Sequence, residues 1–373
     1  MKTFLTFTPR EIPLLIFHMS TFSELLRQWY RDAGRNLPWR DTNDPYPVWL
    51  SEIILQQTRV EQGMPYYLAF LQFFPTIGDL ARADEHEVLK LWQGLGYYSR
   101  ARNLMKTARI IADEYAGKWP STQAELQKLP GVGPYTSAAI ASFCFNEAVP
   151  VVDGNVYRVI SRLQAVTEPI DQAEGKKKIS ELAHVLLSAE HPAKHNQAMM
   201  DFGALICTPK KPKCEDCPAQ TICESYRRGI AEELPIKQRK IQTTERYFPF
   251  LVFRDRGGIL MYQRANRGIW SSLWSFPVLD LSANRLEKPA AVHREFEKLI
   301  GRPFKLKKRI PAGTHKLSHR ELIIEFWEGV KAHSELMAQE ASTTEINAVL
   351  LTPEQIEQLG VPKPVEKYLK SGI

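Results

Sequence analysis

Long apolar runs and cysteines are both scarce in this sequence. No run approaches the length of about 20 apolar residues that a membrane-spanning helix needs, so no membrane span is expected. Only five cysteines occur in 373 residues: four lie within 207–223, and Cys144 lies in an apolar run. Disulfide frameworks belong to oxidising compartments. Four clustered cysteines, together with one cysteine expected in the core, therefore predict a protein of the reducing cytoplasm rather than a secreted protein.

The first 18 residues lack the marks of a cleaved signal peptide. Their apolar stretch, Pro13–Phe17, is short and has no small-residue cleavage site after it. Met19 precedes Ser20-Thr-Phe-Ser-Glu24, which is typical of a helix start. We expect the native chain to start at Met19, with 1–18 as a mis-started or disordered extension.

Composition and patterning predict a multidomain protein. The net charge of +7 favours a polyanionic partner, and the length allows two or three cores. Helical periodicity dominates 19–226, which we interpret as an all-α domain in two lobes around a cleft. A charged stretch, 227–246, is the expected linker. Strand-like runs such as Tyr247–Phe253 then predict an α+β domain over 247–373.

The four clustered cysteines, Cys207, Cys214, Cys217 and Cys223, have the spacing C-x6-C-x2-C-x5-C. This spacing is too tight and uneven for two disulfides, and it contains only one of the two C-x2-C pairs of a structural zinc site. Four thiolates in one short loop suit a [4Fe-4S] cluster, with a four-cysteine zinc site as the alternative. Lysines within the loop predict contact with nucleic-acid phosphates: Lys210, Lys211 and Lys213.

Two further motifs precede the cysteines. Leu129-Pro-Gly-Val-Gly133 before a small-residue helix indicates a helix-hairpin-helix, in which Gly131 and Gly133 permit the turn and free N–H groups face a phosphate. Any Gly-rich helix connection looks similar. Asp153 follows an apolar segment and starts the next predicted helix, where N–H groups hold a carboxylate ionised. Taken alone, Asp153 is simply a good N-cap.

The order hairpin, aspartate and four-cysteine loop resembles the endonuclease III superfamily of DNA glycosylases. Further segments resemble its adenine DNA glycosylase branch, from about Phe22 to Cys223: Leu37-Pro-Trp-Arg40, Trp49–Thr58, Gly94–Tyr98, Asp153-Gly-Asn155 and Asn196–Met200. The resemblance implies base-excision repair of adenine mispaired with 8-oxoguanine or guanine in double-stranded DNA. It also implies a [4Fe-4S] cluster, and we expect a monomer that binds DNA in the bacterial nucleoid.

The resemblance also assigns catalytic residues. Bifunctional relatives carry a lysine two residues after the second hairpin glycine, where this chain has Tyr135. A phenol forms no Schiff base, so a monofunctional hydrolytic enzyme is expected. Glu52, between apolar neighbours, is expected to have a raised pKa and to protonate adenine, while Asp153 stabilises the sugar cation. Tyr135 and Asn155 are expected to hold these groups.

Other residues are expected to contact DNA. Extrusion of the base from the duplex leaves a gap that Gln57 or Tyr97 is expected to fill, with a packing role as the alternative for either residue. Arg35 and Trp39 are expected to line the adenine pocket, and Gln197 stands where some relatives have a Glu.

The C-terminal part resembles a Nudix-fold module of the same branch. Lys298 and Leu299 stand where a working Nudix box has two adjacent glutamates, so loss of hydrolase activity is expected. The loop His315–His319 resembles the branch's 8-oxoguanine-recognition loop, with Ser318 and His319 as hydrogen-bonding residues and Leu317 in place of Phe.

Three alternative functions each conflict with particular residues of the sequence. A bifunctional glycosylase/lyase for oxidised pyrimidines conflicts with Tyr135, and a Nudix hydrolase with a fused DNA-binding domain conflicts with Lys298 and Leu299. A non-catalytic DNA-binding iron-sulfur protein conflicts with the presence of both Glu52 and Asp153.

Overall fold

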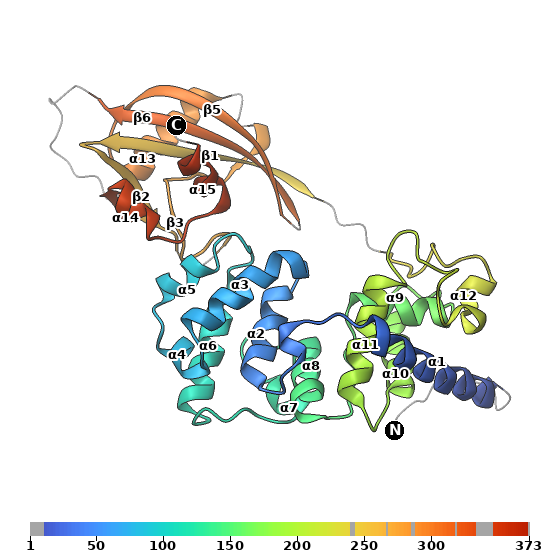
Figure 1. Ribbon diagram of the computed structural model, residues 1–373. Coiled ribbons are helices and arrows are strands. Elements are labelled where there is room, and N and C mark those ends of the chain that lie inside the picture. The colour runs from blue at the N-terminus through green and yellow to red at the C-terminus, as the bar shows by residue number, and fades with distance from the viewer. Residues whose placement is uncertain are drawn as a thin grey trace. The chain divides into compact units, whose positions relative to one another are not determined.

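The computed structural model describes residues 11–238, 243–265, 268–284, 288–317, 319–332 and 346–371, with side chains from residue 21 onward. By their contacts the residues form two units, Met1–Arg82 with Asn103–Lys240, and Ala83–Arg102 with Ile241–Ile373. The first unit is helical, and the second is built around a sheet (Figure 1). The predicted combination of an all-α part with an α+β part is confirmed.

The helical unit contains short and medium helices joined by tight turns. They are α1 (Glu11–Ala33), η1 (Pro38–Arg40), α2 (Pro45–Leu55), α3 (Val60–Phe73), α4 (Ile77–Arg82), most of α6 (Ser99–Asp113), α7 (Gln123–Leu126), α8 (Pro134–Phe145), α9 (Gly154–Leu163), α10 (Ala173–Leu186), α11 (Pro192–Leu205), η2 (Gln220–Ile222) and α12 (Glu224–Arg227). Helix α1 includes 11–18, and a start at Met19 stays a prediction. Among the described helices, none is long and apolar enough to cross a membrane.

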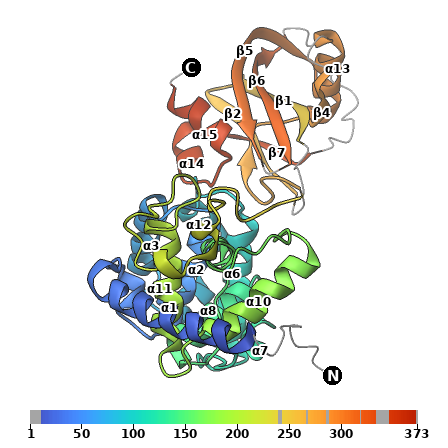
Figure 2. The same ribbon diagram turned by 90° about the vertical axis from the view of Figure 1, so that its right-hand side faces the viewer.

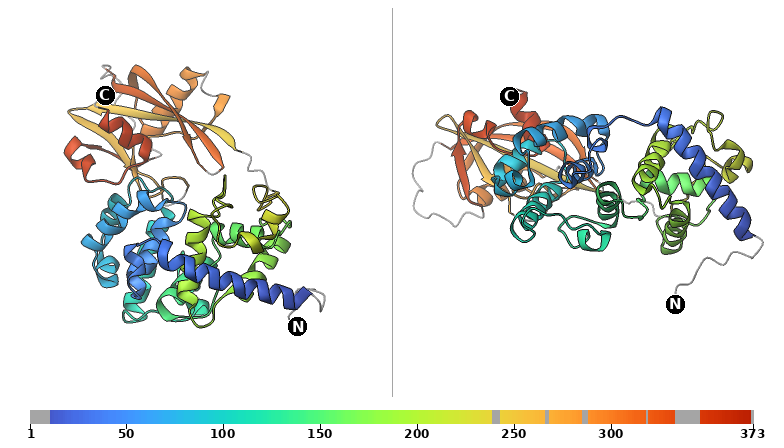
Figure 3. Two further views of the ribbon diagram at one scale, coloured as in Figure 1. Left: turned by 45° about the vertical axis from the view of Figure 1, so that its right-hand side comes forward. Right: turned by 60° about the horizontal axis from the view of Figure 1, so that its bottom comes forward.

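These helices form two lobes within the unit (Figure 3). In one lobe, α1, α9, α10 and α11 share an apolar core that contains Phe22, Ile160, Ile179 and Phe202. In the other, α2 packs against α3 and α8. Helix α2 is buried at nearly every position, so its polar residues are enclosed together with its apolar ones.

The second unit has a mixed sheet with the strand order β3-β2-β1-β6-β5 among the described residues, and β4 and β7 pair with β1 and β2. The strands are β1 (Thr244–Asp255), β2 (Gly258–Gln263), β3 (Trp274–Ser275), β4 (Leu281–Ser282), β5 (Phe304–Lys316), β6 (Arg320–Lys331) and β7 (Ala348–Leu351). The helices are α5 (Glu85–Leu91), α13 (Pro289–Ile300), α14 (Pro353–Glu357) and α15 (Lys363–Lys370). Strands β1 and β6 run parallel.

Alternation along these strands gives the sheet two covered faces. Tyr247 and Trp327 pack with Phe296 of α13 on one face. Phe326 points to the other face, where its ring lies 4.4 Å from the ring of Tyr368 in α15. Helices α13 and α15 thus cover opposite faces, as Figure 2 shows.

Segment Ala83–Arg102 groups with the C-terminal part through polar contacts. The Lys90 Nζ donates to the carbonyl of Leu359 at 3.3 Å, and the Arg102 guanidinium donates to the carbonyl of Ser271 at 2.9 Å. Both acceptors are backbone atoms, which any sequence provides. The sequence pattern of α5 therefore could not predict that this segment packs with the C-terminal part.

Candidate active site

A cavity of about 950 Å³ lies between the two lobes of the helical unit. Its walls come from the end of α2, the turn before α8, the start of α9 and one face of α11. The cavity gathers all four predicted catalytic residues: Glu52, Tyr135, Asp153 and Asn155. Most of the DNA-contact residues predicted for this unit line it as well: Arg35, Trp39, Gln57, Gly131 and Gly133.

Glu52 belongs to the buried helix α2 and is only 7 % exposed. Burial raises the pKa of Glu52 to about 7, and the charge of Asp153 adds to this. A hydrogen bond with Tyr135 and the charge of Arg40 act in the opposite direction. The raised pKa expected from its apolar neighbours is thus found. Near neutral pH this carboxyl group exists in both protonation states.

The hairpin turn leads directly into α8. Gly131 has φ +74°, and a Cβ there would lie 2.7 Å from the Cβ of Asn103, so this position requires glycine. Gly133 is the N-cap of α8 and supplies no side-chain cap. The first N–H groups of α8 are therefore left for another acceptor. Tyr135 follows in the first turn, and its hydroxyl lies 3.6 Å from the Met200 Sδ.

Asp153 is the N-cap of α9, as predicted. Its Oδ1 accepts the N–H groups of Asn155 and Val156, each at 2.8 Å, and its Oδ2 accepts from the Asn155 Nδ2 at 2.7 Å. Burial nevertheless outweighs these donors and raises the pKa of Asp153. The N–H donors of α9 follow from the N-cap position that the sequence predicts. The extent to which Asp153 is buried depends instead on how the residues pack around the cavity.

A line of hydrogen bonds joins this aspartate to the cysteine loop. The Arg158 NH2 donates to the Asn155 Oδ1 at 2.8 Å, and its Nε donates to the carbonyl of Cys207 at 2.7 Å. Arg158 is 7 % exposed, so the link is enclosed by protein. Arg158 was not among the residues predicted from the sequence. Its spacing of one turn from Asn155 on α9 is the only available signal.

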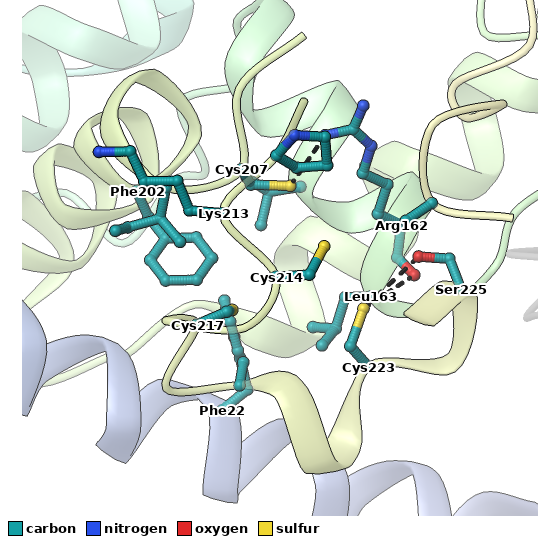
Figure 4. Close-up of a pocket in the computed structure, with 15 residues that line it drawn as sticks. Phe22, Arg162, Leu163, Phe202, Cys207, Lys213, Cys214, Cys217, Cys223 and Ser225 are labelled. Atoms are coloured by element: carbon teal, nitrogen blue, oxygen red, sulfur yellow. Dashed lines mark hydrogen bonds between the residues drawn. The ribbon is translucent and has the colours of Figure 1, made fainter. Parts of the chain in front are cut away.

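The four clustered cysteines line one pocket, with their sulfur atoms directed toward a common centre (Figure 4). None of them forms a disulfide. The Arg162 NH1 donates to the Cys207 Sγ at 3.4 Å and to the carbonyl of Thr208 at 2.7 Å, which fixes the start of the loop. The loop lysines are all exposed, and one of them, Lys213, also lines this pocket: Lys210, Lys211 and Lys213.

An ion-pair cluster forms another wall of the cavity. The Asp201 carboxylate, fully buried, accepts from the Arg35 NH2 at 2.6 Å and from the Arg40 NH1 at 2.7 Å. Arg35 is therefore held by protein, although it also lines the cavity as predicted. Arg40 and Asp201 were not predicted as site residues, because a pair 161 residues apart leaves no local pattern in the sequence.

The remaining predicted DNA contacts fall into two groups. Trp39 and Gln57 line the cavity, and Gln57 has φ +56° just after α2. Gln197 also lines it, and its Oε1 accepts from the Tyr30 hydroxyl at 3.2 Å. Tyr97 belongs to the other unit, where its side chain is 48 % exposed and its φ is +48°.

The predicted recognition loop is described only in part. Ser318 lies outside the described residues. His319 is exposed, and its carbonyl accepts the N–H of Thr244 at 3.1 Å. In the Nudix-like helix α13, Lys298 is exposed and Leu299 is buried against the sheet.

Comparisons with known proteins agree with this architecture. Residues 50–186 match the HhH-GPD superfamily of base excision DNA repair proteins, and residues 249–371 match the NUDIX domain family. An adenine DNA glycosylase of Buchnera aphidicola (Schizaphis graminum) is 34 % identical over 94 % of this chain and 98 % of its own length. That of Rattus norvegicus is 32 % identical over 95 % of this chain and 78 % of its own length.

A solved thermostable thymine-DNA glycosylase is 30 % identical and superimposes with a TM-score of 0.53 over 57 % of this chain and 98 % of its own. The likeness to this solved structure covers little more than half of the chain, whereas the Buchnera relative matches nearly all of it. The chain therefore belongs to the adenine DNA glycosylase family, within the helix-hairpin-helix superfamily of base-excision repair proteins.

Proposed function

We propose that this protein hydrolyses the N-glycosidic bond of adenine mispaired with 8-oxoguanine or guanine in duplex DNA, without cleaving the strand. The single observation that carries this proposal is the cavity that holds Glu52 and Asp153 together with a tyrosine, Tyr135, at the position of the lyase lysine. Two carboxyl groups in different environments can take different roles, one as the general acid and the other as a negative charge that stabilises a cation.

The two carboxyl groups have distinct tasks in this proposal. Glu52, with its pKa raised to about 7, donates a proton to N7 of adenine, which makes the base a better leaving group. The charge of Asp153 is one of the causes that raise the pKa of Glu52, so in this proposal Asp153 carries the negative charge while Glu52 holds the proton. The negative charge of Asp153 stabilises the cation that develops on the sugar. Asn155 holds the Asp153 carboxylate in place, and Tyr135 hydrogen-bonds Glu52.

A [4Fe-4S] cluster fits the pocket of the four cysteines. Their thiols are free and line one pocket. Burial raises the pKa of the Cys207 thiol, and the Arg162 guanidinium beside it acts in the opposite direction. When bound, the cluster would cross-link the loop through its four cysteines. The loop lysines would then be held in position to contact DNA phosphates: Lys210, Lys211 and Lys213.

A single-turnover assay on four duplexes tests the proposal. The duplexes pair adenine with 8-oxoguanine, with guanine and with thymine, and thymine glycol with adenine. We expect adenine release from the first two, with strand breaks only after alkali. Direct nicking at thymine glycol would favour the bifunctional alternative, and tight binding without turnover would favour the non-catalytic one. Light scattering of the complex checks the expected monomer.

The rate of adenine release is expected to fall as the pH rises through about 7. The general acid must be protonated, and above the pKa of Glu52 its protonated fraction falls about tenfold per pH unit. Single-turnover rates between pH 5.5 and pH 9 check this. A rate that rises across this range would contradict an acid role for Glu52.

Replacement of His319 is expected to weaken lesion recognition. In His319→Ala, the preference for 8-oxoguanine over guanine opposite adenine should shrink about tenfold, because one base contact is worth about 1–3 kcal/mol. The ratio of single-turnover rates on the two duplexes measures this. His184→Ala, an exposed histidine of α10, serves as the control. An unchanged ratio in His319→Ala would remove this residue from the recognition loop.

A further inference from the structure

A second cavity, of about 220 Å³, lies in the C-terminal unit on the sheet face that α15 covers. Its floor is apolar and includes Ile324 and Phe326 of β6. Polar side chains from two elements reach its rim: His315 from β5, and Lys363 and Lys367 from α15. No Asp or Glu is among the described residues that line it.

The two rim lysines are available to a ligand. They lie four residues apart on α15, so they project from the same side of the helix. Both are exposed, and within the described part of the chain neither forms an ion pair. The next lysine of the helix, Lys370, differs, because its Nζ lies 2.6 Å from the Glu366 Oε1. A carboxylate thus neutralises the one lysine of α15 that does not line the cavity.

His315 completes the rim as a fixed, neutral donor. Its ring lies 5.6 Å from the ring of Trp270, which holds it at the cavity. Burial and the charges of Lys363 and Lys367 lower the pKa of His315, so its imidazole is neutral at pH 7. His315 is also the first residue of the predicted recognition loop. The rim therefore adjoins the segment expected to read the base.

We propose that this cavity binds a phosphate group of the DNA strand that the recognition loop contacts. Lys363 and Lys367 supply the positive charge, and His315 supplies a hydrogen bond. Two ammonium groups without an ion-pair partner and an imidazole, with no carboxylate among the described residues that line the cavity, suit the single negative charge of a phosphodiester. This proposal rests on the proposed function. It adds a backbone contact that sets the register in which the base contact is made.

The test removes both lysines and measures the salt dependence of DNA binding. The probe is a duplex with a tetrahydrofuran abasic site opposite 8-oxoguanine, followed by fluorescence anisotropy at several salt concentrations. For Lys363→Ala/Lys367→Ala we expect about tenfold weaker binding at 0.1 M salt, and a slope of log K against log salt smaller by about 0.9, the value for one neutralised phosphate. Lys363→Arg/Lys367→Arg should restore the slope, and circular dichroism checks the fold.

The control removes the same charge elsewhere in the unit. Lys298→Ala/Lys370→Ala takes one lysine from α13, on the opposite face of the sheet, and the paired lysine from α15. Equal slopes for the two double variants would overturn the proposal, because the effect would then be one of net charge. Unchanged binding in the first variant would overturn it as well.

A second arm distinguishes DNA from a free nucleotide. Deoxyguanosine monophosphate is titrated into the wild-type protein and into Lys363→Ala/Lys367→Ala. Tight binding that the variant loses, with duplex binding unchanged, would assign the cavity to a free nucleotide and overturn the DNA contact. The abasic probe requires no base release. A protein that binds it as expected but excises no adenine would therefore contradict only the proposed function.

Discussion

Asp153→Asn is expected to slow single-turnover release of adenine by at least about 10³-fold while the affinity for duplex DNA stays near that of the wild type. The substitution removes the negative charge that stabilises the sugar cation, and such preorganised charge is a large term in catalysis. It keeps the shape of the residue. Asparagine is also a good N-cap, so its Oδ1 can still accept the N–H groups of Asn155 and Val156.

A matched control variant distinguishes the loss of a negative charge in the cavity from a change in a helix N-cap. Asp84 caps α5 in the same manner, with its Oδ1 accepting the N–H of His86 at 2.7 Å, but it does not line the cavity. Asp84→Asn should therefore release adenine at the wild-type rate. If Asp153→Asn retained more than about a tenth of the wild-type rate, Asp153 would be only an N-cap.

Local signals in the sequence predicted much of the architecture. Helical periodicity predicted the helical unit, and the glycines of the hairpin predicted the turn before α8. The change of pattern after Arg246 predicted the sheet, although its first strand already begins at Thr244, inside the predicted linker. The N-cap role of Asp153 also follows from a local rule. Each of these features depends on residues a few positions apart, where steric and hydrogen-bonding preferences act within one turn.

Long-range features could not be predicted in the same way. The Asp201 carboxylate joins Arg35 and Arg40 across more than 150 positions, and Arg158 reaches the carbonyl of Cys207 from another helix. The net direction of the Asp153 pKa shift is a similar case, because it depends on how closely the lobes enclose the carboxyl group. Such terms arise only when packing excludes water.

Glu52→Gln is expected to reduce adenine release about 10²–10⁴-fold, the usual range for loss of a general acid. Glutamine has the same shape, and its Oε1 can still accept the hydrogen bond from Tyr135, but it has no acidic proton to give to N7. The variant should bind the abasic-site duplex normally. Because burial raises the pKa of Glu52, the neutral glutamine fits the apolar helix surroundings without a new desolvation cost.

The pH profile distinguishes the loss of an acid from a local distortion. The residual rate of Glu52→Gln should be nearly constant from pH 6 to pH 8, whereas the wild-type rate falls across pH 7 because Glu52 loses its proton there. Glu61→Gln is the matched control, since Glu61 lines the same cavity but is exposed. It should keep both the wild-type rate and the wild-type profile. A Glu52→Gln variant whose rate still falls through pH 7 would show that another group supplies the proton, and the nearby Asp153, with its raised pKa, would then be the acid to test.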